Sequence, residues 1–169
     1  MAFDMIKAEE IINQAFAIFP VETVCLEILQ KGISEIGELW YQNKASVQQE
    51  HFTSALAIRR IESLITSTPN PIRVQRLIAG CPSGEEHTFP VLLLTLLLRR
   101  KGINVIYLGA DIPLEQMEHT AASIHPTLIV LAAQRLTTAA AILSTAQLAQ
   151  RLGIPLAYGG HIFSHLPAL

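Results

Sequence analysis

Residues 74–101 read VQRLIAGCPSGEEHTFPVLLLTLLLRRK, and this stretch decides the fold. Residues 74–80 form an apolar run typical of a strand, and residues 80–87 carry the two glycines and the proline of a turn. About residues 86–101 then have the pattern of a helix. The stretch therefore predicts a strand, a built turn and a helix in succession.

The same alternation continues to the end of the chain. Further strands are predicted at 104–108, 127–132 and 154–158, with helices from Pro113 and over 139–152. Because apolar strands separated by helices form parallel sheets covered on both faces, the sequence predicts an α/β fold. Such sheets bind ligands at the carboxyl ends of their strands.

Residues 1–68 contain no strand signal and predict a four-helix bundle. Asp4 is placed to cap the first helix, Pro20 separates it from the second, and Ser46 with Gln49 forms a capping box for the fourth. Residues 69–169 are then the sheet domain. Because no helix follows the fourth strand, we expect this domain to be truncated at its C-terminus or completed by a partner.

Composition excludes several classes of protein. Half of the residues are apolar and 15% are charged, which rules out disorder. A formal net charge of −2 gives no cationic field for nucleic acid. The most apolar stretch, 89–98, contains Pro90 and is too short to span a membrane. With no signal peptide visible, we expect a cytoplasmic protein that binds neither membrane nor nucleic acid directly. Its surplus apolar surface predicts a large ligand, a homo-oligomer, or both.

The loop after the first strand carries the first candidate site. His87 could bind a metal through one ring nitrogen while Glu85 accepts the proton of the other. The alternative is structural: Ser83 and Glu86 would form a capping box, and His87 would be an exposed residue of the first helical turn. The spacing alone favours the structural alternative.

The pair Gly159–Gly160, at the end of the fourth predicted strand, is the second candidate. Paired glycines let a backbone approach a flat or phosphorylated group, although a plain tight turn explains them equally well. The chain has no GxxxxGK or GxGxxG motif, no metal-ligand spacing among its other histidines, and no nucleophile elbow. Nucleotide binding and hydrolase chemistry are therefore poorly supported.

Trp40, Glu50 and His51 are the third candidate, because they lie at predicted helix ends that could meet at one mouth of the bundle. Taken singly, each has a structural explanation. Trp40 could be a core residue, Glu50 could answer the dipole of its helix, and His51 could be half-buried.

These three sets occur in an order that resembles the cobalamin-binding module of CarH-type light-sensing regulators of the MerR family. Trp40, nine residues, then Glu50-His51 is similar to that family's Trp-x9-Glu-His motif, and Glu85-x-His87 resembles its Glu/Asp-x-His motif. Gly159–Gly160 matches its glycine pair, and residues 109–113 (GADIP) are also typical. The resemblance covers about residues 4–163. It implies a four-helix bundle followed by a Rossmann-like corrinoid domain.

The resemblance also implies a function. The cofactor would be cobalamin, with adenosylcobalamin the expected form, and His87 would be the lower axial ligand of cobalt. Light would cleave the cobalt–carbon bond, so the module would be a photoreceptor that regulates transcription rather than an enzyme. The output or DNA-binding domain is expected elsewhere. The cofactor-binding residues implied are Trp40, Glu50, His51, Gly84, Glu85, His87, Asp111, Gly159 and Gly160.

Three departures from the family pattern keep alternatives open. Pro90 stands where a glycine is usual, Ala132–Ala133 where a serine is common, and Tyr41 where some light sensors have a histidine. The second hypothesis is a corrinoid carrier for methyl transfer, which the Trp-x9-Glu-His motif argues against. A third is a scaffold adapted to haem or a bilin, and a fourth is an interaction module without a ligand.

Overall fold

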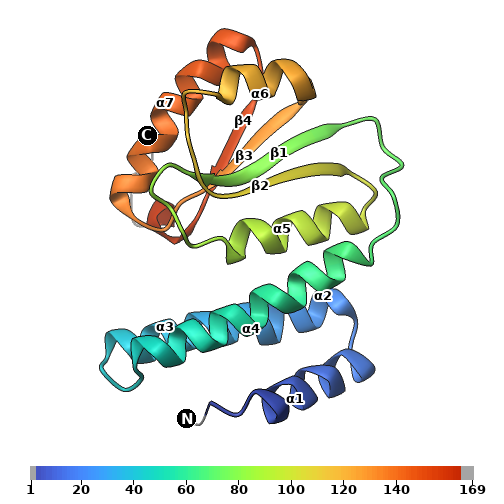
Figure 1. Ribbon diagram of the computed structural model, residues 1–169, viewed down its shortest axis with the longest axis vertical. Helices are drawn as coiled ribbons and strands as arrows, with labels where there is room; N and C mark the ends of the chain where they lie inside the picture. Colours follow the sequence, from blue (N-terminus) through green and yellow to red (C-terminus); the bar gives the residue numbers. More distant parts are fainter. Residues whose placement is uncertain (1–2, 165–169) are drawn as a thin grey trace. The chain divides into compact units, whose positions relative to one another are not determined.

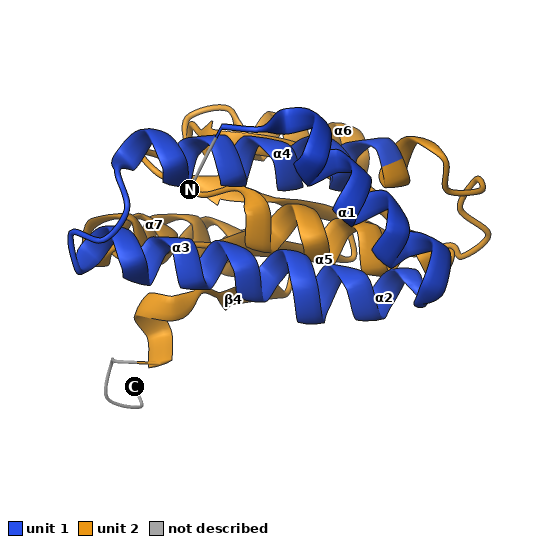
Figure 2. Cartoon of the chain, turned by 90° about the horizontal axis from the view of Figure 1, so that it is seen from below, with its two compact units in different colours: residues 1–63 blue, residues 64–169 orange. Residues whose placement is uncertain are grey.

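A computed structural model describes residues 3–164 of the chain. The chain forms two compact units, residues 1–63 and 64–169, which are described separately (Figure 2). The boundary expected at 68/69 stays a prediction. None of the helices between residues 3 and 164 combines the length and apolarity that crossing a membrane requires.

The first unit is helical (Figure 1). Asp4 caps α1, since its Oδ1 accepts a hydrogen bond from the Lys7 amide at 3.0 Å. The predicted capping box before α4 is confirmed: Ser46 Oγ accepts from the Gln49 amide at 3.2 Å, and Gln49 Oε1 accepts from the Ser46 amide at 2.8 Å. The helices are α1 (Met5–Ile18), α2 (Val21–Thr23), η1 (Val24–Gln30), α3 (Lys31–Tyr41) and α4 (Val47–Thr66), the last of which runs past the unit boundary at residue 63.

The second and third expected helices form one continuous helical stretch from Val21 to Tyr41, whose middle part, η1, is a π-helix. The junction residues Val24 and Lys31 keep right-handed helical angles (φ −62° and −65°), so nothing interrupts the chain there. The apolar pattern could not reveal this continuity, because a π-helix shifts the positions that face the core.

The second unit is an α/β domain with a four-stranded parallel sheet, as predicted. Its strand order is β2-β1-β3-β4, and all three neighbouring pairs are parallel. Helix α5 packs against one face of this sheet and α7 against the other (Figure 1). The elements are β1 (Arg76–Pro82), α5 (Phe89–Arg100), β2 (Asn104–Ile112), α6 (Met117–Ile124), β3 (Leu128–Ala132), α7 (Leu136–Leu152), β4 (Leu156–Gly159) and η2 (His161–Ser164).

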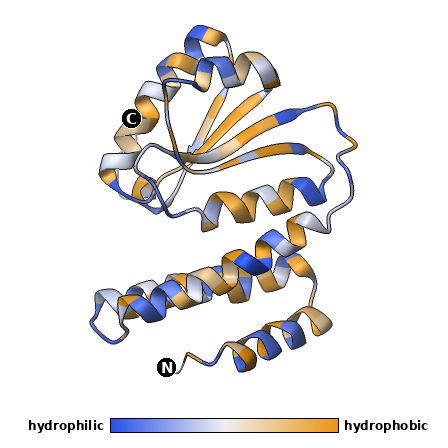
Figure 3. Cartoon of the chain, in the orientation of Figure 1, coloured by the Kyte–Doolittle hydropathy of each residue, from blue (hydrophilic) through white to orange (hydrophobic). Residues whose placement is uncertain are grey.

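Side chains of the central strands alternate between the two faces, and Figure 3 shows the apolar character of these strands. In β1, Leu77 and Ala79 join the cluster that includes Val91 of α5, whereas Ile78 joins the cluster that includes Ile142 of α7. A strand buried on both faces is continuously apolar, which is why its sequence reads as an unbroken run.

Two element boundaries differ from the prediction and shape the site. Helix α5 begins at Phe89 instead of Glu86, since Pro90 suits only the first turn of a helix. Strand β2 runs on to Ile112, past the expected end at 108, with irregular pairing to β1 near its end. Residues 83–88 therefore form a loop.

This loop leaves β1 at the point where the order of strands reverses. Strand β1 pairs with β2 on one side and β3 on the other, so the loops that follow β1 and β3 open next to each other. The expected truncation at the C-terminus concerns residues 165–169 and beyond, which lie outside the described residues.

Candidate functional site

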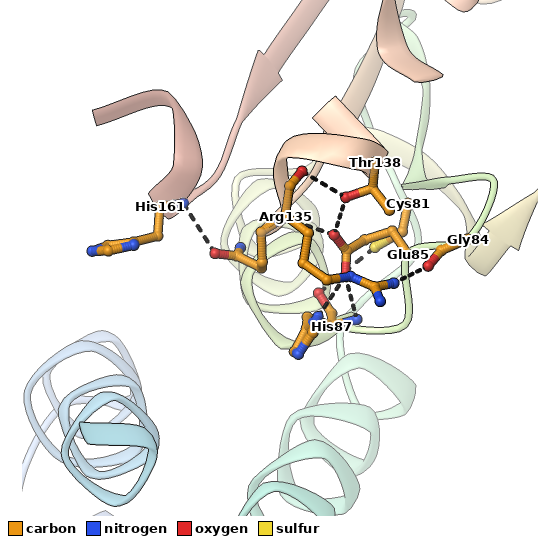
Figure 4. Close-up of polar contacts among 8 residues, drawn as sticks. Cys81, Gly84, Glu85, His87, Arg135, Thr138 and His161 are labelled. Carbon is orange, nitrogen blue, oxygen red and sulfur yellow. Dashed lines mark hydrogen bonds and ion pairs between the residues drawn. The ribbon is translucent and has the colours of Figure 1, made fainter. Parts of the chain in front are cut away.

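The carboxylate of Glu85 is the centre of the site (Figure 4). Glu85 is fully buried at 0% exposure, yet both of its oxygens are engaged. Oε2 accepts hydrogen bonds from the Gln134 amide at 2.7 Å and from Thr138 Oγ1 at 2.5 Å. Oε1 accepts from the His87 amide at 3.1 Å. One side chain of the β1–α5 loop is thus tied to the start of α7.

These contacts decide the charge of Glu85. Burial alone would raise the pKa of this carboxyl group, but the hydrogen bonds from Gln134, Thr138 and His87 outweigh burial and lower its pKa from 4.5 to about 2. The carboxylate is therefore ionised at neutral pH.

His87 is oriented by this carboxylate. Its Nδ1 lies 2.5 Å from Glu85 Oε1, while its side chain remains 57% exposed. Because an ionised carboxylate only accepts hydrogen bonds, Nδ1 carries the proton of the neutral ring. Nε2 then presents its lone pair, and none of residues 3–164 offers it a hydrogen bond. The predicted pairing of Glu85 with His87 is confirmed, and the alternative in which Ser83 and Glu86 cap a helix is wrong because α5 begins later.

Cys81, near the end of β1, holds the loop through its side chain. Its thiol donates a hydrogen bond to the His87 carbonyl, with a sulfur–oxygen distance of 3.7 Å. Burial, with the charge of Glu85 adding to it, raises the pKa of the Cys81 thiol from 9.0 to about 12. The thiol therefore stays protonated and remains a donor.

Gly84 and Asp111 are brought together at the carboxyl ends of β1 and β2, which are neighbours in the sheet. Asp111 Oδ1 accepts from the Gly84 amide at 2.7 Å and from Ser83 Oγ at 3.3 Å, and the Asp111 amide donates to the Glu85 carbonyl at 3.0 Å. Arg135 Nη2 donates to the Gly84 carbonyl (Figure 4). Gly84 and Asp111 both have positive φ, +79° and +49°, which glycine and aspartate adopt more readily than most residues.

The glycine pair 159–160 lies at the carboxyl end of β4, which is parallel to β3 and next to it in the sheet. Gly160 has φ +126°, and a Cβ there would lie 1.8 Å from the Ala133 carbonyl oxygen, so no other residue fits. A Cβ on Gly159 would meet nothing within 4 Å. The next residue, His161, donates its amide to Gln134 Oε1 at 3.0 Å (Figure 4). Of these two residues, Gly160 must be glycine for the fold, whereas Gly159 need not be.

An open apolar groove of about 610 Å³ adjoins β4 on the α7 side of the sheet. Tyr158 and Phe163 contribute rings whose centroids lie 4.7 Å apart. Aliphatic side chains of α7 and β4 complete the lining, among them Leu136, Leu143 and Leu156.

In the first unit, Trp40 lies in the last turn of α3, Glu50 lies in the first turn of α4, and His51 directly follows it. Trp40 is 49% exposed, so it is no core residue. His51 Nδ1 lies 2.7 Å from Glu50 Oε2, and Glu50 Oε1 accepts from Ser54 Oγ at 2.6 Å. The two helix ends flank one short connection, residues 42–46.

The sequence did not reveal four residues of the site: Gln134, Arg135, Thr138 and Cys81. The first three lie about fifty positions from the loop along the chain, and Gln134 and Thr138 meet Glu85, and Arg135 meets Gly84, only because β1 and β3 are neighbours. No spacing rule could have connected them. Their one signal was their position directly after a predicted strand.

The side chains able to bind a metal limit which cofactor the site can hold. No group of three or more His, Cys, Asp or Glu side chains able to hold a metal ion exists among residues 3–164. A single imidazole backed by an ionised carboxylate fits a metal whose other ligands come from a macrocycle. A side-chain-free backbone at Gly159 leaves room for part of a large ligand beside it. The residues present therefore fit a metal-containing macrocycle such as a corrinoid.

Comparison with known families decides between macrocycles. Two family models, each described as a B12 binding domain, match residues 1–65 and 75–169, and the second covers more than half of the chain. The chain belongs to the B12-binding domain family. It is thus a cobalamin-binding module, which favours cobalamin over haem or a bilin.

Two curated relatives are similar to this B12-binding chain. The HTH-type transcriptional repressor CarH of Myxococcus xanthus is 27% identical over 130 residues, 77% of this chain and 43% of that protein. The HTH-type transcriptional repressor CarA of the same organism is 29% identical over 126 residues, 74% of this chain and 42% of that protein. The predicted resemblance to CarH-type regulators is confirmed. The chain spans less than half the length of these relatives.

Solved structures share the fold. The monomethylamine corrinoid protein of Methanosarcina barkeri superposes with a TM-score of 0.71 at 21% identity, over 90% of this chain and 76% of that chain. The methanol:cobalamin methyltransferase complex of the same organism gives a TM-score of 0.51 at 22% identity, over 83% of this chain and 55% of that chain. At these identities the likeness concerns the fold alone.

Proposed function

We propose that the chain is a cobalamin-binding sensory module in which His87 is the lower axial ligand of cobalt. The observation that carries this proposal is the contact between Glu85 Oε1 and His87 Nδ1. This contact holds the proton on Nδ1, so that the lone pair of Nε2 is the one able to bind cobalt. Glu85 itself is held by the start of α7, so the imidazole is oriented before any ligand binds.

Cobalamin supplies a light-sensitive cobalt–carbon bond when its upper ligand is an adenosyl group. We assign Trp40 to contact with this upper ligand, because its large exposed ring is otherwise unexplained. Glu50 and His51 are polar neighbours on α4 that can hydrogen-bond the upper ligand or the amides of the corrin. The expected form of the cofactor is therefore adenosylcobalamin.

The second unit also offers a place for the rest of the ligand. The backbone at Gly159–Gly160 presents no side chain, and the apolar groove beside β4 adjoins it. We assign the nucleotide tail of the cofactor to this region, where a close backbone approach is possible.

The relatives support a regulatory role. Both are named as HTH-type transcriptional repressors, and this chain matches less than half of each. We propose that the module is a cytoplasmic homo-oligomer that acts as a binding protein rather than an enzyme. DNA binding would belong to a domain outside residues 1–169.

The test is an absorption spectrum of the purified chain with adenosylcobalamin, recorded in the dark and again after green light. A bound corrinoid spectrum that changes on illumination, together with a change in sedimentation, is the expected result. Bound cobalamin that is indifferent to light would favour a methyl-transfer carrier instead. Failure to bind any cobalamin would overturn the proposal altogether.

A further inference from the structure

Gly84, in the loop that carries Glu85 and His87, is held through both of its backbone groups. Its amide donates to Asp111 Oδ1 at 2.7 Å, and its carbonyl accepts from Arg135 Nη2. Asp111 comes from the end of β2, whereas Arg135 directly precedes α7. Residues from two other elements, each more than 25 positions along the chain from Gly84, therefore hydrogen-bond to the backbone of this one loop residue.

We infer that Asp111 and Arg135 are positioning residues that fix the loop so that His87 is placed for cobalt. This inference rests on the proposed function, because it concerns the ligand assigned there. Neither residue needs to touch the cofactor in this role. The inference therefore gives Asp111 another role than the cofactor binding that the resemblance to CarH-type regulators implied.

The loop has little order of its own. Its internal backbone bonds are limited to two tight turns, from the Glu85 amide to the Pro82 carbonyl at 3.0 Å and from the Thr88 amide to the Glu86 carbonyl at 2.9 Å. Residues 83, 84, 86 and 87 are exposed, so packing does not hold them. The loop must therefore be held by bonds to other elements.

Asp111 makes three such bonds. Besides the Gly84 amide, its carboxylate accepts from Ser83 Oγ at 3.3 Å, and its own amide donates to the Glu85 carbonyl at 3.0 Å. Its φ of +49° turns the backbone of β2 so that both carboxylate and amide point at the loop. An aspartate in this conformation is uncommon and is explained by these contacts.

Arg135 makes the matching bond on the other side (Figure 4). The Gln134 amide and Thr138 Oγ1, on either side of Arg135 in sequence, hold the Glu85 carboxylate. Main chain and side chain of the loop are thus fixed to the same end of α7. A ligand must be held within roughly 0.5 Å of its productive position, which a loop fixed at one point alone does not achieve.

The first test uses the protein without cofactor. Asp111→Gly removes the acceptor and keeps the positive φ, whereas Asp111→Asn keeps both an acceptor oxygen and a residue that tolerates that φ. Amide exchange at Gly84, followed by NMR, should accelerate at least about tenfold in Asp111→Gly and stay close to wild type in Asp111→Asn. Amides in the middle of α5 should be unchanged in both variants.

The second test measures ligation directly. Chains labelled with nitrogen-15 histidine are loaded with cobalamin reduced to Co(II), and the EPR superhyperfine pattern reports whether a protein histidine is the axial ligand. The ratio of histidine-ligated to unligated cobalt should fall in Asp111→Gly and in Arg135→Ala by up to roughly 10-fold, the lower end of the loss seen when a direct partner of a metal-binding histidine is removed, because both residues act on His87 through the loop. Asp111→Asn and Arg135→Lys should restore most of it.

Arg151→Ala is the matched control, since it removes the same charge from the far end of α7. It should leave the ratio unchanged. If the wild type shows histidine ligation and Asp111→Gly and Arg135→Ala show the same ratio, the inference is overturned while the proposed function stands. If the wild type itself shows no histidine ligation, the proposed lower ligand fails, and the inference fails with it.

Discussion

His87 Nδ1 lies 2.5 Å from Glu85 Oε1, so an exposed imidazole is oriented by a fully buried carboxylate. The other oxygen of that carboxylate belongs to a separate set of hydrogen bonds, from the start of α7. Movement of α7 relative to the loop would therefore shift the Glu85 carboxylate and, with it, the orientation of the His87 ring. The two residues couple the fold of the second unit to its proposed ligand.

Replacing Glu85 by Gln should destabilise the second unit. Both carboxylate oxygens accept hydrogen bonds, and a Gln side chain must turn its NH₂ group toward one of the two sets of donors. We expect a loss of about 2–3 kcal/mol in the free energy of unfolding of the cofactor-free protein, measured with urea. Glu86→Gln, at the exposed neighbouring position, is the control and should change stability by less than about 0.5 kcal/mol.

The same carboxylate predicts a pH dependence of stability without cofactor. The folded pKa of Glu85 is lowered from 4.5 to about 2, so its stabilisation is present above pH 4.5. The stabilisation is lost as the pH falls from 4.5 toward 2, because the unfolded state then binds the proton first. The loss should reach roughly 3 kcal/mol and be absent from Glu85→Gln. Parallel urea titrations of both proteins across this range would show it, and identical slopes would count against the ionised carboxylate.

The glycine pair allows a fold effect to be separated from a ligand effect. Gly160→Ala should destabilise the second unit by more than about 2 kcal/mol, because its Cβ would meet the Ala133 carbonyl oxygen at 1.8 Å. Gly159→Ala meets nothing within 4 Å and should fold normally. If the cofactor tail lies against Gly159, this variant should still lose cobalamin affinity by at least about tenfold. Unchanged affinity in a titration followed by absorbance would remove Gly159 from the site.

Trp40→Ala tests the assignment of the upper ligand. Because Trp40 is half-exposed, its removal should leave the folding of the first unit largely intact. Corrin affinity should change little, whereas retention of the adenosyl group or assembly in the dark should change clearly by absorbance and sedimentation. Ile18→Ala, at the end of α1 and at a position 72% exposed, is the control. Wild-type behaviour of Trp40→Ala in both dark and light would remove its assigned role.

The order of elements in the second unit was predictable because buried parallel strands have unbroken apolar sequences, as Ile129–Leu131 of β3 illustrate. Glu85 and His87 were identifiable as a candidate pair because they lie two positions apart in one loop, but the spacing alone favoured a structural role, and only the resemblance to CarH-type regulators singled the pair out. Thr138 was not, since its contact with Glu85 depends on the pairing of β1 with β3, and strand order leaves no local trace. The later start of α5 was missed because Glu86 has good helical propensity, whereas Pro90 and the bonds of the loop decide the boundary.

The assignment of His87 as the lower ligand is the central claim, and the EPR spectrum of Co(II) cobalamin bound to the chain tests it most directly. With unlabelled protein, the superhyperfine lines should be triplets, and nitrogen-15 histidine should convert them to doublets. In His87→Ala, which should remain folded because the side chain is 57% exposed, labelling should have no effect. Triplets that persist in the labelled wild-type protein would show that the cofactor's own base holds the cobalt, and would contradict the account.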